Sequence, residues 1–232
     1  MKTMSAFDLQ GKKGLVLGLA NEHSIAWGCA RQAQAMGAEV VASCLNDKAR
    51  AFVEPLTQPI GMDLQTCNIE TPEDLEKLVA YAAAKLGRLD FVIHSIAWAP
   101  LADLHGRVID SSSVGFARAM EVSCHSFATL AKLCAPHMSL GGSMVTMSYL
   151  GADEAVPHYG LMGPVKAALE SLVRYMAVEL GPQGVRVYAV SPGPILTRAA
   201  SGIEAFDALM QNNIAKAPLG RLVTLEEIAN LS

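Results

Sequence analysis

Several features that assign a chain to a broad class are missing from this sequence. Its 232 residues contain no block of like charge, and 18 basic against 22 acidic residues give a formal net charge of −4. A mildly acidic chain of this kind lacks the basic surface that attracts nucleic acid or an anionic membrane. The charge pattern therefore gives no support for either partner. There is also no internal repeat, low-complexity tract or linker.

The cysteines lack the spacing of a metal site or a disulfide framework. There are five, with no CxxC pair, at Cys29, Cys44, Cys67, Cys124 and Cys134. An odd number without a framework is typical of free thiols in a reducing compartment, and we expect no metal. Residues 1–5 have no apolar signal-peptide core, and the most apolar stretch, residues 91–102, is too short to span a membrane. We therefore expect a cytoplasmic protein.

Short apolar runs alternate with longer segments of helical periodicity along the chain. Most of the runs have no polar alternation, which is typical of parallel strands buried on both faces. The pattern predicts one domain over residues 1–232: a Rossmann-like, doubly wound parallel α/β sheet with helices on both faces. The predicted strands are 14–19, 39–44, 62–67, 91–94, 143–147 and 185–190, and the predicted helices are 24–36, 48–56, 72–86, 111–138 and 157–180.

The segments that follow the strands are the candidate ligand site, because such sheets bind ligands beyond the carboxyl ends of their strands. After the first strand, residues 18–28 lack the GxGxxG fingerprint. They still offer a glycine turn, a serine able to cap the next helix, and small residues for close packing. That combination suits a pyrophosphate, and it equally suits an ordinary capped turn. After the second strand, Asp47 favours NAD whereas Lys48 opposes it.

Two segments late in the chain carry a recognisable spacing. Tyr149 stands ten residues before Tyr159, and Tyr159 stands seven before Lys166. Four further motifs complete the pattern. They are Gly-x5-Ser-Ile-Ala-x-Gly at 18–28, His-Ser-Ile-Ala at 94–97, Ser-Pro-Gly-Pro-Ile-Leu-Thr at 191–197 and Ala-Ala-Ser-Gly-Ile at 199–203. From about residue 9 onward the chain resembles the enoyl-acyl-carrier-protein reductases, a divergent branch of the short-chain dehydrogenase/reductase superfamily.

The spacing of seven separates this branch from its commoner relatives, which place tyrosine and lysine four residues apart. Here Met162 stands four residues before Lys166, and its thioether cannot act as an acid. Seven residues make about two helical turns, so Tyr159 and Lys166 share a face if the helix begins near Tyr159.

The resemblance implies reduction of the carbon–carbon double bond of a trans-2-enoyl thioester, the last step of the fatty-acid elongation cycle. NADH is the favoured cofactor, with NADPH as the alternative. Tyr159 would donate a hydrogen bond to the oxygen that becomes negative, and the nearby Lys166 ammonium would make that phenol more acidic and bind the nicotinamide ribose. Tyr149 would lie at the mouth of the substrate site, or else pack as a strand-end aromatic.

The same resemblance assigns further contacts by position. His94 and His158 flank the site, but a packing role is preferred for both. Asn68 replaces an aspartate often found there, and its amide can still bind adenine. A homotetramer is implied. Substrate contacts fall on Ala99, Tyr149 and Tyr159, and cofactor contacts on Gly18, Ser24, Ile25, Leu45, Asn68, Ile69, Ser95, Ile96, Lys166 and residues 195–199, with Ile195 and Thr197 among them.

Two departures from the family pattern bear on the substrate and on the chain end. Glu204, Asp207 and Ala208 stand where the best-known members carry basic residues that can meet an acidic carrier protein. Carboxylates there would oppose that partner, so the carrier docks elsewhere or the substrate is a coenzyme A thioester. The family also continues for another helix and strand beyond Ser232, so we expect that a tail is omitted.

Two other functions are compatible with the sequence. One is a carbonyl reductase or alcohol dehydrogenase of the same superfamily, in which Ser148 would serve as the strand serine of that chemistry. The other is a non-catalytic nucleotide-binding protein that retains the fold alone.

Overall fold

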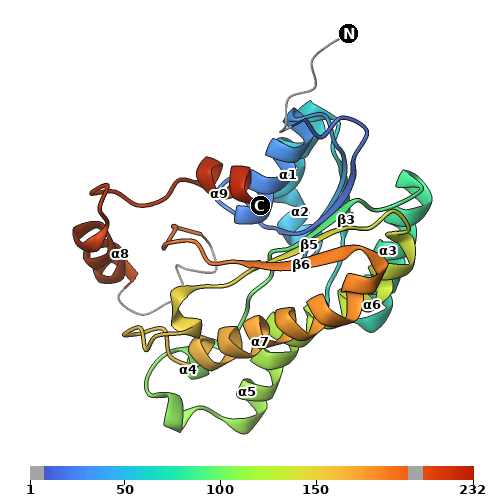
Figure 1. Cartoon of the computed structure of the whole chain (residues 1–232). Coiled ribbons are helices and arrows are strands. Elements are labelled where there is room, and N and C mark those ends of the chain that lie inside the picture. Colours follow the sequence, from blue (N-terminus) through green and yellow to red (C-terminus); the bar gives the residue numbers. More distant parts are fainter. Residues whose placement is uncertain (1–7, 198–205) are drawn as a thin grey trace.

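The computed structural model describes residues 8–197 and 206–232, and a single parallel sheet forms its centre (Figure 1). All neighbouring strands in this sheet run parallel, in the order β3-β2-β1-β4-β5-β6. The order reverses between β1 and β4, where a doubly wound sheet opens a crevice at the carboxyl ends of its strands. The predicted Rossmann-like fold is confirmed. The strands are β1 (Lys13–Leu19), β2 (Glu39–Cys44), β3 (Asp63–Thr66), β4 (Phe91–His94), β5 (Gly142–Met147) and β6 (Val185–Val190).

Helices cover both faces of the sheet, as predicted (Figure 1). One face carries α1 (Ile25–Ala35), α2 (Asp47–Thr57) and α9 (Leu225–Leu231). The other carries α3 (Pro72–Leu86), α4 (Leu101–Leu104), α5 (Ser113–Met120), α6 (Ser126–Cys134) and α7 (Met162–Leu180). Helix α8 (Phe206–Lys216) lies beyond the carboxyl ends of β5 and β6, apart from both layers.

The absence of polar alternation in the strands follows from this arrangement. Leu15, Val16 and Leu17 are successive residues of β1, and each is at most 1% exposed. Leu15 and Leu17 pack with Phe127 of α6 on one face, whereas Val16 packs with Trp27 of α1 on the other. Each of these three residues of β1 therefore enters one of two hydrophobic layers, which removes the need for a polar position.

The predicted helix 111–138 is wrong in one respect, because it is interrupted near its middle. Helix α5 ends at Met120, a π-helical turn runs from Glu121 to His125, and α6 begins at Ser126. The wider turn buries Val122, Ser123 and Cys124 in succession. Two serine hydroxyls make hydrogen bonds here. Ser123, in the turn, bonds the Trp98 backbone, and Ser126, the first residue of α6, donates to the Val122 carbonyl at 2.7 Å.

The predicted helix 157–180 begins later than expected. Helix α7 starts at Met162, because His158 and Gly160 both have positive φ, at 63° and 50°. Gly160 also approaches the Leu104 carbonyl so closely that an added Cβ would lie 3.0 Å from that oxygen. The segment before Met162 is therefore a compact turn. Tyr159 lies in this turn and not on the helix.

Most other boundaries agree with the prediction, and β2, β4, β6 and α3 agree residue for residue. The four-residue α4 has no counterpart among the predicted segments. Within the described ranges, no helix is both long enough and apolar enough to cross a membrane.

Candidate active site

The loops after β1 and β4 meet where the strand order reverses. Gly18 has φ 102°, and a Cβ added there would lie 2.2 Å from the Ser95 carbonyl oxygen and 3.2 Å from Ile96 Cγ1. The Ser95 amide donates to the Leu17 carbonyl at 3.1 Å. Only glycine combines this backbone angle with this close approach. Three of the predicted cofactor residues are therefore adjacent in the structure.

Ser24 occupies the N-cap position of α1, but its side chain does not cap the helix as expected. Its hydroxyl donates to the Asn21 carbonyl at 2.7 Å and accepts from the Ala20 amide at 3.3 Å. The serine thus fixes the loop and leaves the first amides of α1, beginning with Ile25, directed at the crevice. Close helix packing is confirmed, because a Cβ on Gly28 would lie 2.7 Å from Leu225 Cγ of α9.

The loops after β2 and β3 form the next part of the crevice edge. Leu45 is 54% exposed, and Asn46 caps α2 by accepting from the Ala49 amide at 3.0 Å. After β3, the Asn68 side chain accepts from the Glu70 amide at 3.2 Å, while Ile69 packs against the core. Local turns therefore hold the residues that were predicted to contact the adenine side of the cofactor.

Lys166 is buried at the centre of the candidate site. Only 4% of the residue is exposed, and its Nζ donates to the Met147 carbonyl oxygen at 2.6 Å. This bond joins the second turn of α7 to the carboxyl end of β5. Burial lowers the pKa of Lys166 to about 8, although Cys124 and Glu170 oppose that shift. At neutral pH the site therefore contains a buried ammonium group.

Tyr149 and Tyr159 pack against each other, with ring centroids 4.7 Å apart and ring planes at 55°. Gly151 makes room for the second ring, since an added Cβ would lie 2.3 Å from Tyr159 Cδ1. Burial, and then Tyr149, raise the pKa of Tyr159 above its ordinary value. The expectation that Lys166 acidifies this phenol is therefore wrong for this structure: burial dominates, and the ammonium bonds Met147.

The Tyr149 hydroxyl is a buried polar group in need of a partner. Among the described residues it has no hydrogen bond of good geometry. Burial raises its pKa, and the approach of Asn213 from α8 partly opposes that rise. The Asn213 amide itself donates to the Leu209 carbonyl at 2.9 Å. Buried hydroxyls almost always have a partner, so this one fits a ligand that supplies an acceptor or donor.

Known proteins share both the sequence and this arrangement. The model of one family, described as Enoyl-(Acyl carrier protein) reductase, matches residues 18–232. Enoyl-[acyl-carrier-protein] reductase [NADH] 1 of Rhizobium meliloti is 42% identical over 223 residues, which cover 96% of this chain and 82% of the relative. The chain belongs to the enoyl-acyl-carrier-protein reductases.

Solved structures of this reductase family give the same result. The enoyl-acyl-carrier-protein reductase of Anaplasma phagocytophilum, solved in complex with NAD, has a TM-score of 0.92 at 40% identity and covers 99% of this chain and 88% of its own. The NADH enzyme of Aquifex aeolicus also has a TM-score of 0.92, at 38% identity, covering 96% of this chain and 88% of its own.

The two histidines beside the reductase site have no acid–base arrangement. His94 is 1% exposed, with Nδ1 3.0 Å from Thr146 Oγ1 and Nε2 2.9 Å from Ser126 Oγ. Burial, and then Lys166, lower the pKa of His94 to about 3, so the ring is neutral. His158 is exposed and forms part of the left-handed turn before α7. The preferred packing role fits His94.

The remaining predicted residues lie around the crevice. Ala99 packs against the core on the side of α7. A cavity of about 200 Å³ beside Ser24 is lined by His23, Ile195, Leu196, Val223 and Leu225. The Thr197 amide donates to the Ile195 carbonyl at 2.8 Å. Residues 198 and 199 of the predicted cofactor run, the motif at 199–203 and Glu204 lie outside the described residues.

One functional contact was missed by the sequence reasoning. The Ser148 hydroxyl donates to the Glu170 carboxylate, and Glu170 stands four residues after Lys166 on the same helix. The spacing of four is a signal that could have suggested Glu170 as a neighbour of Lys166. Because Ser148 is engaged by this carboxylate, it is not free to act as the strand serine of a carbonyl reductase.

The buried ammonium predicts an unusual stability change. The pKa of Lys166 in the folded state, about 8, lies below its ordinary value. Below pH 8 the native state therefore bears a penalty of about 3 kcal/mol, which fades as pH rises from about 8 to about 10.5. Lys166→Met removes the penalty and loses one hydrogen bond, worth about 1 kcal/mol. We expect a variant that is more stable at pH 7, with a smaller advantage at pH 10.

Urea denaturation at the two pH values measures this difference. Lys132→Met removes an exposed lysine from α6 and should leave stability within about 0.5 kcal/mol at both. A Lys166→Met variant less stable than the parent at pH 7 would contradict the assignment of a costly buried charge.

Proposed function

We propose that this chain reduces the carbon–carbon double bond of a trans-2-enoyl thioester carried by acyl-carrier protein, with NADH as the reductant. This is the last step of the fatty-acid elongation cycle. The observation that carries the proposal is the buried cluster of Tyr149, Tyr159 and Lys166 beside the close approach of Gly18 and Ser95, in a chain of this reductase family. We treat residues 1–232 as one nucleotide-binding and catalytic domain.

Tyr159 is the proposed donor to the thioester oxygen. When bound, NADH supplies a hydride to the β-carbon, and negative charge develops on that oxygen. A phenol whose pKa is raised by burial keeps its proton at neutral pH, so it can donate there. A preorganised donor in a water-poor site stabilises such charge by about 3 kcal/mol. The Tyr149 hydroxyl, which has no hydrogen bond of good geometry among the described residues, would contact the same carbonyl.

Lys166 is the proposed ligand of the nicotinamide ribose. Its ammonium has three donors, of which the Met147 carbonyl takes one, so two remain for ribose hydroxyls. We assign the rest of the cofactor site to residues that border the crevice or its edge. They are Gly18, Ser24, Ile25, Leu45, Asn68, Ile69, Ser95, Ile96, Ile195 and Thr197, with Ala99 beside the substrate.

Tyr159→Phe tests the donor directly. The variant keeps the ring contact with Tyr149 and loses only the hydroxyl. We expect kcat with a crotonyl thioester to fall by about 10²–10³, while the Kd for NADH stays within twofold. Stopped-flow oxidation of NADH and equilibrium fluorescence measure the two quantities. Tyr188→Phe, the same change at a residue of β6 that is 47% exposed, should alter neither.

The outcome also separates the other functions. Full retention of activity by Tyr159→Phe would argue for a different donor. Activity of the parent enzyme with simple ketones but not with enoyl thioesters would favour the carbonyl-reductase alternative, and NADH binding without any turnover would favour a non-catalytic protein.

A second substrate class, the enoyl-coenzyme A thioesters, is favoured by one observation. Asp207 and Ala208 are exposed at the start of α8, beside the site, where a basic surface would suit an acidic carrier protein. Asp207→Lys should raise kcat/KM for crotonyl-acyl-carrier protein by about threefold at low salt, because opposite charges speed association. The value for crotonyl-coenzyme A should change less. If Asp207→Lys changed kcat/KM equally for both substrates, the carrier protein would dock at a surface other than the start of α8.

We propose a cytoplasmic homotetramer. The five free cysteines are all buried, which suits a reducing compartment. Large apolar side chains are exposed on α7, with Tyr175 70% and Val178 77% exposed. Such residues are typical of a face covered by another subunit. Sedimentation equilibrium should give four chains per particle, and a monomer at micromolar concentration would contradict the proposal.

A further inference from the structure

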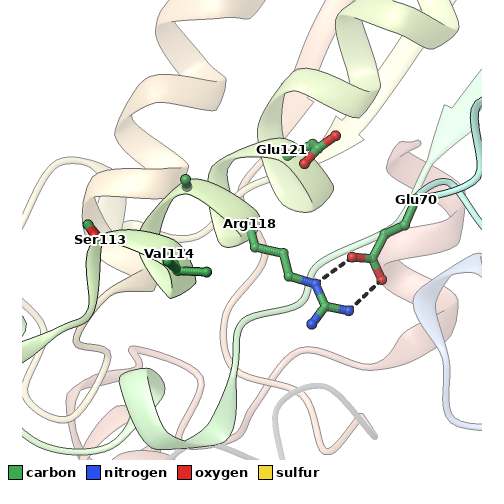
Figure 2. Close-up of a pocket in the computed structure, with 6 residues that line it drawn as sticks. Glu70, Ser113, Val114, Arg118 and Glu121 are labelled. Carbon is green, nitrogen blue, oxygen red and sulfur yellow. Dashed lines mark hydrogen bonds and ion pairs between the residues drawn. The ribbon is translucent and has the colours of Figure 1, made fainter.

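Arg118 connects two loops that lie on opposite sides of the crevice. Its guanidinium donates to the Glu70 carboxylate through both Nε and Nη2, with the second contact at 2.9 Å. The same group lies over the Trp98 ring, with Cζ 4.3 Å from the ring centroid. Figure 2 shows the side chain leaving α5 and pointing toward the Glu70 carboxylate. Both residues line a cavity of about 490 Å³.

The two loops joined by Arg118 contain residues assigned to the cofactor site. Glu70 directly follows Asn68 and Ile69 in the loop after β3, here called loop 68–70. Trp98 belongs to the loop after β4, here called loop 95–99, which begins with Ser95 and Ile96. Strands β2 and β1 lie between β3 and β4 in the sheet, so no direct strand pairing holds the two loops together.

Further hydrogen bonds hold the two residues that Arg118 contacts, Glu70 and Trp98. The Asn68 side chain accepts from the Glu70 amide, so movement of Glu70 is transmitted to Asn68. On the other side, the Trp98 amide donates to Ser123 Oγ, and that hydroxyl donates to the Trp98 carbonyl, both at 2.8 Å. Ser123 is fully buried in the π-helical turn. The Trp98 backbone therefore has a rigid support, and Arg118 extends that support to loop 68–70.

We propose that Arg118 is a positioning residue that holds loops 68–70 and 95–99 at the separation required by the dinucleotide before it binds. Ordering two loops at the moment of binding has an entropic cost that lowers affinity, and a clamp present in the free enzyme removes part of it. The Arg118 guanidinium holds the pKa of Glu70 below its ordinary value, so the carboxylate stays charged at neutral pH.

The contacts are suited to tuning affinity and add little to global stability. The side chains of Arg118 and Glu70 are 49% and 33% exposed, and ion pairs this open to solvent stabilise a fold only slightly. Loss of the clamp should therefore change cofactor binding without a matching change in the melting temperature. The proposal rests on NADH as the cofactor, and binding of NADH to the parent enzyme tests that premise separately.

Arg118→Met and Glu70→Gln test the clamp, because each removes the ion pair: the first keeps an unbranched apolar stem, and the second keeps the shape of the side chain. We expect each to raise the Kd for NADH by about three- to tenfold, the range for losing a partly exposed ion pair with or without a cation–π contact. The kcat at saturating NADH should stay within twofold and the melting temperature within about 2 °C. The double variant should bind NADH no more weakly than the weaker-binding single variant, because the two substitutions remove the same interaction.

Glu70→Gln separates the clamp from a simple attraction between Arg118 and the cofactor phosphates. If attraction were the cause, freeing Arg118 from Glu70 would tighten NADH binding, whereas loss of the clamp weakens it. The difference in the Kd for NADH between the parent and Arg118→Met should also become smaller in 1 M NaCl, because the Debye length there is only about 3 Å and the ion pair is screened.

Lys85→Met is the matched control. It breaks the Lys85–Asp63 ion pair at the opposite end of β3, where Nζ and Oδ2 are 3.2 Å apart, and should leave the Kd unchanged. An unchanged Kd in Arg118→Met, or tighter binding in Glu70→Gln, would overturn the clamp. Failure of the parent enzyme to bind NADH would overturn both the clamp and the proposed cofactor.

Discussion

The hydrogen bond from Lys166 to the Met147 carbonyl is the contact on which the rest of the site depends. It places an ammonium in a region from which water is excluded, and a buried charge needs at least one good partner. The bond also fixes α7 against the end of β5. Tyr149 follows β5 by two residues, and Tyr159 precedes α7 by three, so both tyrosines are positioned by the two elements that this bond joins.

The geometry of the tyrosine pair comes from the backbone between those elements. A left-handed residue on each side of Tyr159 turns its ring toward Tyr149, and the missing side chain of Gly151 leaves space for it. A helix beginning at Tyr159 would satisfy the interval of seven to Lys166 equally well in sequence. The turn achieves the juxtaposition differently: it moves the phenol off the helix and into the crevice. The interval of seven therefore singles out Tyr159 and Lys166 as candidates, but it does not determine the backbone conformation around Tyr159.

The sequence was sufficient for the sheet, and it singled out Tyr149, Tyr159 and Lys166 as candidates for the site. Strands buried on both faces leave continuous apolar runs, and β2 and β4 were accordingly predicted to the residue. The errors involve contacts between residues far apart in the chain. The π-helical turn accompanies a bond between Ser123 and Trp98, 25 residues apart, and the side chains of His94 and Thr146 are 52 residues apart. The periodicity of a short sequence window cannot predict contacts between residues so far apart in the chain.

The same limit explains the wrong direction of the Tyr159 pKa. From sequence, a lysine seven residues away suggests a nearby positive charge, which lowers the pKa of a phenol. The opposing effect, removal of the phenol from water, depends on Leu161, Met162 and the other side chains that close the core around the ring. Burial is a property of the assembled fold, and here it is the largest cause of the raised pKa of Tyr159.

Groups that are unfavourable for folding are concentrated around the reductase crevice. They include the Lys166 ammonium and the Tyr149 hydroxyl, which has no hydrogen bond of good geometry among the described residues. Each would normally be selected against in a core, and active sites retain such groups because they act on a ligand. A bound dinucleotide and thioester would supply oxygens to both the ammonium and the hydroxyl. Ligand binding should therefore stabilise this region more than any other, since it satisfies groups that the folded chain alone leaves incomplete.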